Sequence, residues 1–478
     1  MRESSLYTRG MSLETTDQSE RKASRAGAPA VPGLLLVFAG TRPRLAAIPV
    51  GDDARVLGRG ELDGIQLDHK SLSRRHAMVE YVADRFVVRD LSSRNGTFLD
   101  GLRIDEAEAR PGAVLRLGET LFLLCADVSL FQGAAMDLSA EMVMGPRLQR
   151  VWGEIARAAG EGGCLHLVGE TGSGKELAAR QFHRASGRQS EPFIAVNCAT
   201  IPPLIAERLL FGARRGAYSG ADTDADGYLQ AAHGGTLFLD EVADLSLEVQ
   251  AKLLRVIESR EVLQLGATRA RPVDLRLCSA THRDLRDEAA AGRFRQDLYY
   301  RIGRPSTVVP PLRARPEDLP WLVQWLLGKQ SQPLELHVSF VEAVLTRPWP
   351  GNVRELATEV ATAANSARAE GHTQLEEQHL PSTAGQPLGG AAVRDATAPR
   401  TPLRTIPEVA PEDRPPGPEL PPRVRATLEV LMTGASDKQI ASELGISQHT
   451  VHQYVKALFK AYNVDSRAKL VAQLLRKS

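Results

Sequence analysis

One stretch of the sequence combines glycines and a lysine at the spacing of a phosphate-binding loop. The segment GETGSGKE follows the apolar run CLHLV and precedes a stretch with helical periodicity. In such a strand-to-helix turn, glycines let backbone N–H groups approach phosphates, and the lysine reaches the β- and γ-phosphates. The residue after the lysine is a glutamate, where a Ser or Thr usually binds Mg²⁺. We expect ATP to contact Gly169, Glu170, Thr171, Gly172, Ser173, Gly174, Lys175 and Glu176.

Two adjacent carboxylates end a second apolar run, GGTLFLDE. A buried strand that ends at the phosphate-binding edge of a sheet presents its last side chains to the same ligand. We expect Asp240 to hold Mg²⁺, through a water molecule, and Glu241 to act on the water that attacks the γ-phosphate. The same pair on a helix surface would carry no chemistry, so this interpretation depends on the strand.

Three polar clusters lie at turns between short apolar runs nearer the N-terminus. They are Gly58-Arg59, Ser73-Arg74-Arg75-His76 and Asn95-Gly96-Thr97. Arginine and serine side chains bind a phosphate dianion through charge-assisted hydrogen bonds, and loops at one end of a β-sandwich often carry binding residues. Each cluster alone has an ordinary explanation, because Asn-Gly commonly forms a hairpin turn and an arginine at a strand end is usually solvated. Only the combination predicts a phosphate site.

A fourth group of polar residues lies near the C-terminus, on a segment with helix-turn-helix periodicity. Ser447 is placed to cap a helix in which Val451, Val455 and Leu458 face inward. The outward positions carry groups suited to base edges and phosphates, although such a face can also be merely solvated. We expect DNA contacts from Gln448, His449, Thr450, His452, Gln453 and Lys456.

The elements that must position these groups divide the chain into several domains. Its 478 residues fit about three domains, and 43% hydrophobic and 24% charged residues exclude a wholly disordered chain, a collagen-like fibre or a coiled-coil rod. Short runs between turns predict a β-sandwich, and alternating strands and helices predict a parallel sheet. We expect a disordered lead-in at 1–32, a β-sandwich at 33–130, an α/β region at 139–305, a helical region at 306–380, a Pro-rich linker at 381–422 and a helix-turn-helix domain at 423–478.

Charge, cysteine content and hydropathy narrow the function classes further. The net charge is +1, so any binding of nucleic acid must be local. The four cysteines lie far apart without a CxxC pair, which predicts reduced, structural thiols. No apolar run approaches the ~20 residues that span a bilayer, and the N-terminus lacks a signal-peptide pattern. We therefore expect a cytoplasmic protein that does not bind membranes.

The first domain resembles the forkhead-associated (FHA) domain over residues 33–130, because the three clusters occur in its order. The resemblance implies that Arg59, Ser73 and Arg74 hold a phosphothreonine and that Asn95 fixes the peptide backbone. It also implies that His76 supports the loop without touching the ligand. The same fold can serve as a docking scaffold with an unused pocket.

Residues 139–380 resemble the AAA+ domain of bacterial enhancer-binding proteins, the activators of sigma-54 RNA polymerase. Besides the glycine loop and the DE strand, the segments GARRGAYSGA, GRFRQDLYYRI and WPGNVREL carry the resemblance. It implies a ring, a hexamer in its active form, in which Arg295 and Arg301 act in trans on the neighbouring nucleotide. It also implies that Arg354 is the sensor II arginine, that Asn197 reorients the catalytic glutamate, and that a glutamate after the loop lysine is usual.

Two departures from this family fall in functional segments. GAYSGA stands where the family carries GAFTGA, so we expect contact with sigma-54 through Gly216, Ala217, Tyr218, Ser219, Gly220 and Ala221. Tyr218 and Ser219 replace Phe and Thr but keep an aromatic ring and a hydroxyl. His282 stands at the sensor I position, where the family has asparagine, and its larger, titratable ring can alter turnover.

The C-terminal segment SDKQIASELGISQHTVHQYVKALFKAYNVDSRAKLVA resembles the LuxR-type helix-turn-helix. Enhancer-binding proteins usually end in a Fis-like helix-turn-helix, so this end is atypical for the central domain. Val424 also departs from the LuxR pattern, which has a glutamate there.

Together the resemblances imply a multidomain fold, with an all-β FHA sandwich, an α/β AAA+ P-loop ATPase with a helical lid, and an all-α helix-turn-helix. They imply a transcriptional activator that uses ATP and Mg²⁺ to remodel sigma-54 RNA polymerase at promoter or enhancer DNA. The chain would assemble from a dimer to a hexameric ring and be gated by a phosphothreonine protein or its Ser/Thr kinase. Two alternatives stay open. One is a phosphopeptide-gated repressor or sigma-70 co-regulator that does not engage sigma-54, which His282 and the altered loop favour. The other is a signalling adaptor, against which the helix-turn-helix argues.

Overall fold

The computed structural model describes residues 30–51, 53–217, 222–330, 332, 334–387 and the four residues 427, 450, 451 and 455. The chain forms two compact units, residues 1–403 and 404–478. The expected lead-in before residue 30, the linker after residue 387 and most of the helix-turn-helix therefore lie outside the described residues. Within the described part, no helix has the length and apolar composition needed to cross a bilayer.

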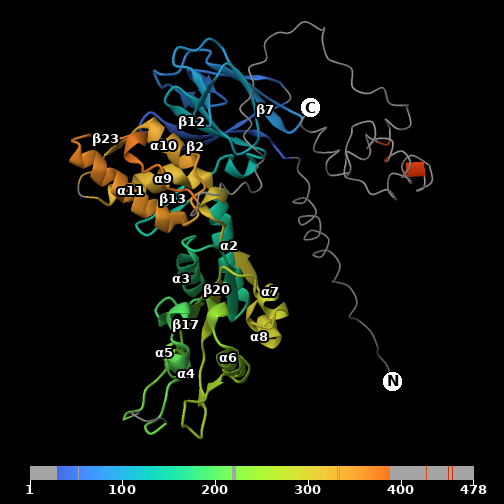
Figure 1. The fold of residues 1–478 in the computed structure, drawn as a ribbon, viewed down its shortest axis with the longest axis vertical. Coiled ribbons are helices and arrows are strands. Elements are labelled where there is room, and N and C mark those ends of the chain that lie inside the picture. Colours follow the sequence, from blue (N-terminus) through green and yellow to red (C-terminus); the bar gives the residue numbers. More distant parts are fainter. Residues whose placement is uncertain are drawn as a thin grey trace, which may run out of the picture. The chain divides into compact units, whose positions relative to one another are not determined.

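Residues 33–125 form a β-sandwich (Figure 1, blue to cyan). One sheet has the strand order β2-β1-β12-β11-β8-β9 and the other β10-β7-β6-β3, while β4 and β5 form a separate ribbon. The pairings within these sheets are antiparallel. The strands are β1 (Gly33–Ala39), β2 (Arg42–Pro49), β3 (Arg55–Leu57), β4 (Gly60–Leu62), β5 (Ile65–Leu67), β6 (Ala77–Val82), β7 (Arg85–Asp90), β8 (Thr97–Leu99), β9 (Leu102–Ile104), β10 (Glu106–Ala109), β11 (Val114–Leu117) and β12 (Thr120–Cys125).

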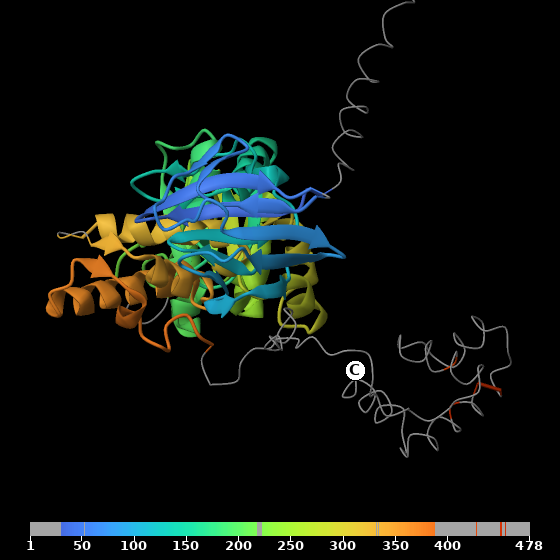
Figure 2. The same cartoon turned by 90° about the horizontal axis from the view of Figure 1, so that it is seen from above.

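Strand β1 is buried on both of its faces. Leu34 and Leu36 point into the core between the two sheets, whereas Leu35 and Val37 join a second core with the helical region. Because successive residues of a strand point to opposite faces, a strand buried on both sides reads as a continuous apolar run. The run LLLVFA has this form, as does TLFLLC in β12. The outer face of the six-stranded sheet therefore packs against the lid helices (Figures 1 and 2).

The central region contains a five-stranded parallel sheet in the order β16-β17-β20-β15-β21. Helices cover both faces, since Leu237 and Leu239 of β17 enter one core and Phe238 enters another. The strands are β15 (Cys164–Val168), β16 (Phe193–Asn197), β17 (Thr236–Asp240), β20 (Arg276–Thr281) and β21 (Ser306–Val308). The helices are α2 (Pro146–Glu161), α3 (Lys175–Ala185), α4 (Pro203–Phe211), α5 (Tyr228–Ala231), α6 (Leu247–Ser259), α7 (Leu285–Ala290) and α8 (Gln296–Ile302). Small ribbons pair β13 (Asp137–Leu138) with β14 (Val143–Met144) and β18 (Glu261–Val262) with β19 (Arg271–Pro272).

A helical lid follows, with α9 (Leu319–Gly328), α10 (Val338–Leu345) and α11 (Asn352–Ala369). A short parallel ribbon joins β22 (Glu335–Leu336) to β23 (Gln374–Leu375). The fully buried Trp349 donates its indole Nε1–H to the Val344 carbonyl at 2.8 Å and so fixes the turn between α10 and α11. Short 3-10 helices complete the described chain: η1 (Ser129–Phe131), η2 (Cys198–Thr200), η3 (Val242–Asp244), η4 (Leu312–Ala314), η5 (Pro316–Asp318) and η6 (Glu377–His379).

The sandwich, the α/β sheet and the helical lid confirm the expected fold classes of these regions, but two boundaries differ. Strand β21 pairs with β15, so the sheet continues beyond residue 305, where the lid was expected to begin. The segment 381–387 packs on the lid instead of starting the linker. Ala384 is buried there, and the Gly385 carbonyl accepts a hydrogen bond from the Trp349 N–H at 3.1 Å.

Candidate functional site

The glycine loop lies between β15 and α3, at the carboxyl edge of the parallel sheet. Gly172 and Gly174 have φ angles of 76° and 108°, which favour glycine. A Cβ on Gly172 would lie 2.3 Å from the carbonyl oxygen of Gly351 in the lid. The loop therefore fits tightly beneath the lid, and α3 begins at Lys175 with backbone N–H groups that can donate to a phosphate.

Lys175 lies between this loop and the end of strand β17. Its side chain is 7% exposed, and Nζ donates to the carbonyls of Gly169 at 3.0 Å and Glu170 at 3.4 Å. The same Nζ lies 3.5 Å from Oε1 of Glu241. The structure thus brings together the predicted loop, its lysine and the predicted catalytic carboxylate.

Asp240 and Glu241 stand at the end of β17, where the apolar run predicted them. Burial raises the pKa of Asp240, against the attraction of the Lys175 ammonium. Burial alone would also raise the pKa of Glu241, but the hydrogen bonds from His282 and the charge of Lys175 outweigh it and lower that pKa. Glu241 is therefore ionised, and Asp240 offers the kind of oxygen ligand that Mg²⁺ prefers.

The Glu241 carboxylate is held by the end of β20. Its Oε2 accepts hydrogen bonds from Thr281 Oγ1 at 3.1 Å, from the His282 N–H at 3.3 Å and from His282 Nδ1 at 2.8 Å. Because an ionised carboxylate only accepts, Nδ1 of His282 carries the proton. The family pattern marked His282 as unusual, but only the folded chain shows that it contacts the Glu241 carboxylate.

Asn197 ends β16 directly opposite Asp240 in the sheet register. Its Oδ1 accepts the Ala199 N–H at 3.0 Å and caps η2. Among the described residues, the side-chain hydrogen bonds of Glu241 come from Thr281 and His282 and none from Asn197. The expected contact between Asn197 and the glutamate is therefore not formed in this structure.

The lid holds the loop through residues that the sequence did not single out. Asn352 is fully buried with a φ of 55°, and its Nδ2 donates to Glu170 Oε2 at 3.1 Å and to the Thr171 carbonyl at 3.0 Å. Arg313 binds both oxygens of the Glu170 carboxylate, at 2.7 and 2.5 Å. The signal was present in WPGNVREL, where an asparagine adopts the left-handed turn that opens a helix.

Three arginines, Arg295, Arg301 and Arg354, were predicted to act on the nucleotide. Only Arg354 lies beside the glycine loop of its own chain. Arg354 is exposed on α11, with its Cβ 3.2 Å from the position of a Cβ on Gly172. Arg295 pairs with Asp297 at 2.6 Å, and Arg301 lines a cavity of about 230 Å³ near the start of β15. In the described part of the chain, neither Arg295 nor Arg301 contacts the loop lysine or the two carboxylates.

The predicted sigma-54 loop is described only at its base. Gly216 and Ala217 belong to the described residues, and Tyr218, Ser219, Gly220 and Ala221 lie outside them. A β-bridge between Ala213 and Ala225 closes the base of this loop.

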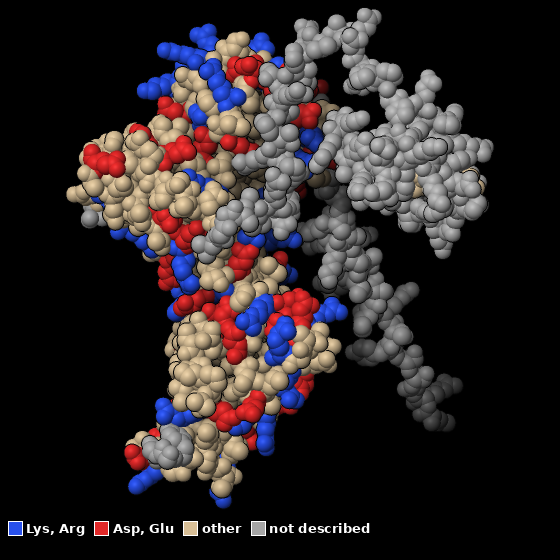
Figure 3. Space-filling model, viewed as in Figure 1, with Lys and Arg blue, Asp and Glu red and all other residues tan. Residues whose placement is uncertain are grey.

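The four predicted phosphopeptide residues lie on loops at one end of the sandwich. The Arg59 N–H donates to the Ser73 carbonyl at 2.8 Å, and Asn95 Nδ2 donates to the Ser71 carbonyl at 2.7 Å. These bonds tie three loops together, while Arg59, Arg74 and Asn95 remain exposed. Figure 3 shows Lys and Arg side chains gathered over the upper part of the sandwich. The arrangement presents cations and amides to an anionic ligand.

His76 supports these loops from the interior. It is fully buried, its Nδ1 accepts the Ser73 N–H at 3.2 Å, and its Nε2 donates to the Gly96 carbonyl at 3.1 Å. Burial lowers the pKa of His76, which favours this neutral ring. A Cβ on Gly58 would lie 2.1 Å from the Arg74 carbonyl oxygen, so only glycine fits where two of the loops meet.

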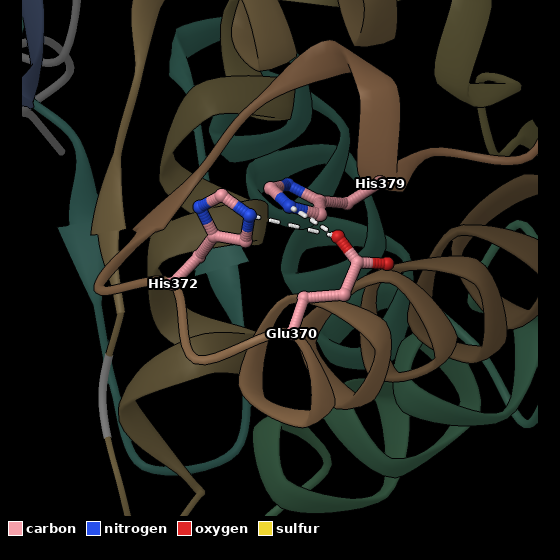
Figure 4. A group of neighbouring side chains, drawn as sticks. All are labelled: Glu370, His372 and His379. Carbon is pink, nitrogen blue, oxygen red and sulfur yellow. Dashed lines mark ion pairs between the residues drawn. The ribbon is translucent and has the colours of Figure 1, made fainter.

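A separate cluster in the lid brings together Glu370, His372 and His379 (Figure 4). Nε2 of each histidine lies 3.6 Å from Glu370 Oε2. However, Nδ1 of His379 accepts the Glu376 N–H at 3.0 Å, so its Nε2 carries the proton of the neutral ring. A metal ligand needs a lone pair at that nitrogen. The three side chains therefore form a polar cluster around one carboxylate, in which Nε2 of His379 has no lone pair to offer a metal ion.

Little of the predicted helix-turn-helix is described. Val451 and Val455 are buried, as their helical spacing predicted, and Thr450 is partly buried. The other predicted DNA contacts, Gln448, His449, His452, Gln453 and Lys456, lie outside the described residues.

Four family models match the chain in the order that the sequence predicted. They are an FHA domain at residues 55–118, a sigma-54 interaction domain at 142–306, an AAA+ ATPase lid domain at 313–393, and bacterial regulatory proteins of the luxR family at 418–474.

Curated relatives match over about half to two thirds of the chain. The Nif-specific regulatory protein of Herbaspirillum seropedicae is 42% identical over 233 residues, 48% of this chain and 43% of that protein. The transcriptional regulatory protein ZraR of Klebsiella oxytoca is 36% identical over 311 residues, 64% of this chain and 66% of that protein. The chain therefore spans less than two thirds of the length of these relatives.

Among solved structures, NtrX from Brucella abortus aligns with a TM-score of 0.48 and 28% identity, over 66% of this chain and 69% of that chain. NtrX has also been solved in complex with ADP. The four matched domains and these curated relatives agree on one family. The chain belongs to the sigma-54-dependent transcriptional regulators, with an FHA domain before the AAA+ domain and a LuxR-type helix-turn-helix domain after it.

Proposed function

We propose that this protein is an ATPase that activates transcription by sigma-54 RNA polymerase under the control of phosphothreonine recognition. The convergence of the glycine loop, Lys175, Asp240 and Glu241 at one edge of the parallel sheet carries the proposal. Phosphoryl transfer to water needs groups that bind the phosphates and carboxylates that act on Mg²⁺ and on the attacking water. The glycine loop and Lys175 supply the first, and Asp240 and Glu241 supply the second.

The chemical step follows from this arrangement. Lys175 and the first N–H groups of α3 bind the phosphate oxygens and offset their charge. Asp240 would hold Mg²⁺, which supplies further positive charge at the phosphates when bound. Glu241 starts ionised and accepts the proton of the attacking water, for which its Oε2 must first leave Thr281 and His282.

Assembly into a ring completes the nucleotide site in this proposal. Arg295 and Arg301 lie away from the carboxylates of their own chain, so they are available to a neighbouring subunit. A guanidinium supplied in trans stabilises the charge of the transferring phosphoryl group. Hydrolysis would move the loop at residues 216–221, which we propose contacts sigma-54.

In this proposal the FHA domain receives the regulatory signal, and the helix-turn-helix domain selects the DNA site. Arg59, Ser73, Arg74 and Asn95 would bind a phosphothreonine on a partner protein or on this chain. Residues 423–478 would bind DNA upstream of the promoter through the predicted recognition helix.

The deciding experiment mixes the full chain with sigma-54, ADP and aluminium fluoride and asks by gel shift whether a trapped complex forms. We expect a stable complex that disappears in Ser219→Ala, because the loop hydroxyl is part of the contact. Intact hydrolysis without any complex would contradict contact with sigma-54.

A second candidate function is a DNA-binding regulator that binds ATP without engaging sigma-54. The hydrogen bond from His282 to Glu241 favours it, because it restrains the residue that must act on water. Hydrolysis by the full chain that is lost in Glu241→Ala would argue against the form without catalysis.

A further inference from the structure

One ion pair crosses the packing surface between the FHA sandwich and the lid. Arg116 of β11 donates its Nε–H to Oε2 of Glu342 in α10 at 2.7 Å. The two side chains are 18% and 10% exposed, and the residues around them form a continuous apolar core between β1, β12, α9 and α10. Burial raises the pKa of Glu342, against the attraction of Arg116. A charged pair inside an apolar surface adds little stability, because desolvation opposes the attraction, so a specific role should be sought.

Arg116 is linked to the phosphopeptide loops through the ring of Phe98. Its guanidinium carbon is 3.6 Å from the centre of the Phe98 ring. The edge of that ring lies 3.2 Å from the position of a Cβ on Gly96, in the turn that carries Asn95. A shift of this turn would therefore move the ring on which the arginine is stacked.

A second route joins the same arginine to the neighbouring loop. Arg116 Nη1 donates to the Gly118 carbonyl at 3.4 Å. A Cβ on Gly118 would lie 2.6 Å from Ser71 Oγ, so the two turns are in direct contact. The Ser71 carbonyl accepts a hydrogen bond from Asn95 Nδ2, and Ser71 lies on the loop that carries Ser73.

On the other side of the pair, α10 leads to the nucleotide loop. The Val344 carbonyl at the end of α10 accepts the Trp349 indole N–H at 2.8 Å, and the Trp349 carbonyl accepts the Asn352 N–H at 2.9 Å. Asn352 then binds Glu170 and the Thr171 carbonyl. Short contacts thus connect the phosphopeptide loops, the ion pair, the lid turn and the phosphate-binding loop.

We propose that the Arg116–Glu342 pair couples the phosphopeptide site of the FHA domain to the nucleotide site. The pair holds α10 in the position in which Asn352 supports the nucleotide loop, and a peptide bound at Arg59 and Asn95 displaces Arg116 from that position. The inference rests on the proposed function, since it assigns the regulation of that same site. Coupling of this kind is reciprocal, so each ligand must change the affinity of the other by the same factor.

The first test measures the Kd of a fluorescent ADP analogue for the full chain and for Arg116→Gln, Glu342→Gln and the double variant. We expect each single change to weaken binding by about threefold or more, and the double variant to match the single ones, because the same pair is broken once. The charge-swapped variant with Arg116→Glu and Glu342→Arg should recover part of the affinity.

The matched control is the pair between Arg89 and Glu106, whose side chains are 48% and 52% exposed on the other sheet of the sandwich. Changing both to glutamine should leave the Kd of ADP within about twofold of the parent. Thermal unfolding of every variant checks that the chain still folds. Additive effects of the two interface changes, or Kd values that all stay within about twofold, would overturn the role of the pair.

The second test adds a pool of phosphothreonine peptides randomised around the phosphorylated residue, with the unphosphorylated pool as a control. Peptide should raise the Kd of ADP by about threefold or more in the parent and not in Arg116→Gln. Peptide binding without any change in the parent overturns the coupling but leaves the phosphopeptide site standing. If no peptide binds, the proposed function of the FHA domain fails and the coupling fails with it, while the ADP measurements still show whether the pair supports the nucleotide loop.

Discussion

In the proposed mechanism, hydrolysis depends most directly on the carboxylate of Glu241. The Glu241→Gln variant keeps the shape of the side chain and cannot accept a proton, so we expect ATP to bind as in the parent while hydrolysis falls by roughly 10²- to 10⁴-fold. Phosphate release and equilibrium ATP binding measure the two effects separately. Glu248→Gln, on the exposed first turn of α6, is the control and should hydrolyse ATP normally. Residual turnover near the parent rate in Glu241→Gln would mean that another group accepts the proton.

His282 tunes that carboxylate, and its removal should appear in the pH profile. Its hydrogen bond helps hold the pKa of Glu241 below the ordinary value, which keeps the carboxylate ionised into the acid range. In His282→Ala this pKa rises, so the acid limb of kcat moves to higher pH. His282→Asn, which keeps a donor, should shift the limb less. An acid limb at the same pH in the parent and in His282→Ala would show that Glu241 is not the titrating group.

Arg59 is the cation that we expect to matter most for the phosphopeptide. A charge-assisted hydrogen bond to phosphate contributes enough that Arg59→Ala should weaken phosphothreonine-peptide binding by about tenfold or more. ATP hydrolysis without peptide should stay unchanged. Arg85→Ala, which removes an exposed arginine paired with Glu108, is the matched control. Equal peptide affinity in Arg59→Ala and the parent, measured by calorimetry, would refute the site.

At the scale of elements, strand β15 carries a buried histidine that makes the sheet sensitive to acid. Burial lowers the pKa of His166 to about 4, and Nδ1 contacts Ser279 Oγ at 2.9 Å. In the unfolded chain His166 binds a proton near pH 6.5, whereas in the folded chain it does so only near pH 4. The free energy of unfolding is therefore highest above pH 6.5 and decreases as the pH falls towards 4. At pH 5 this decrease is about 2 kcal/mol.

The measurement for this element is urea unfolding at pH 7.5 and pH 5, followed by tryptophan fluorescence, since Trp152 packs in the same core as β15. His166→Asn removes the titration and should lose less stability between the two pH values, whatever its absolute stability. An identical pH dependence in the parent and the variant would assign the acid sensitivity to other groups.

Most elements could be predicted from periodicity, and the exceptions have physical causes. Alternating strands and helices indicated the parallel sheet, and the runs in β1 and β12 indicated strands. The continuous apolar runs in β1 and β12 also indicate that both faces of these strands are buried, which the sequence analysis did not infer. A sandwich exposed on its outer faces would alternate, so continuous apolar runs mean that a second partner covers them. That partner is the lid, whose helices supply the other half of the core.

The sequence predicted those residues of the candidate site that belong to a short, continuous motif. The glycine loop, Lys175, Asp240 and Glu241 lie together at one edge of the sheet, as their motifs predicted, because a strand-to-helix turn and the carboxyl ends of parallel strands fix them in space. The contacts of Glu241 with His282 and of Asn352 with Glu170 join segments far apart in the chain. Spacing along the sequence cannot reveal such pairs, since the tertiary fold alone brings them together.

At the scale of the whole molecule, the proposed ring allows a sharp prediction. If Arg301 acts in trans, each active site takes Glu241 from one subunit and the guanidinium from the next. Subunits with Glu241→Gln and subunits with Arg301→Ala should then be almost inactive alone. Mixed rings contain some sites where an intact Glu241 faces an intact Arg301.

A random equal mixture of these variants should therefore recover about one quarter of the parental sites, because half of the subunits keep Glu241 and half of their neighbours keep Arg301. The rate of phosphate release, followed as the mixing ratio is varied, should be greatest near equal amounts and fall towards zero at both ends. Mixing Glu241→Gln with Lys175→Ala is the control, because both changes fall on the nucleotide side of one subunit and no mixed site is complete. If Arg301 instead served the nucleotide of its own chain, every mixture would stay as inactive as its parts, since no subunit would hold both residues.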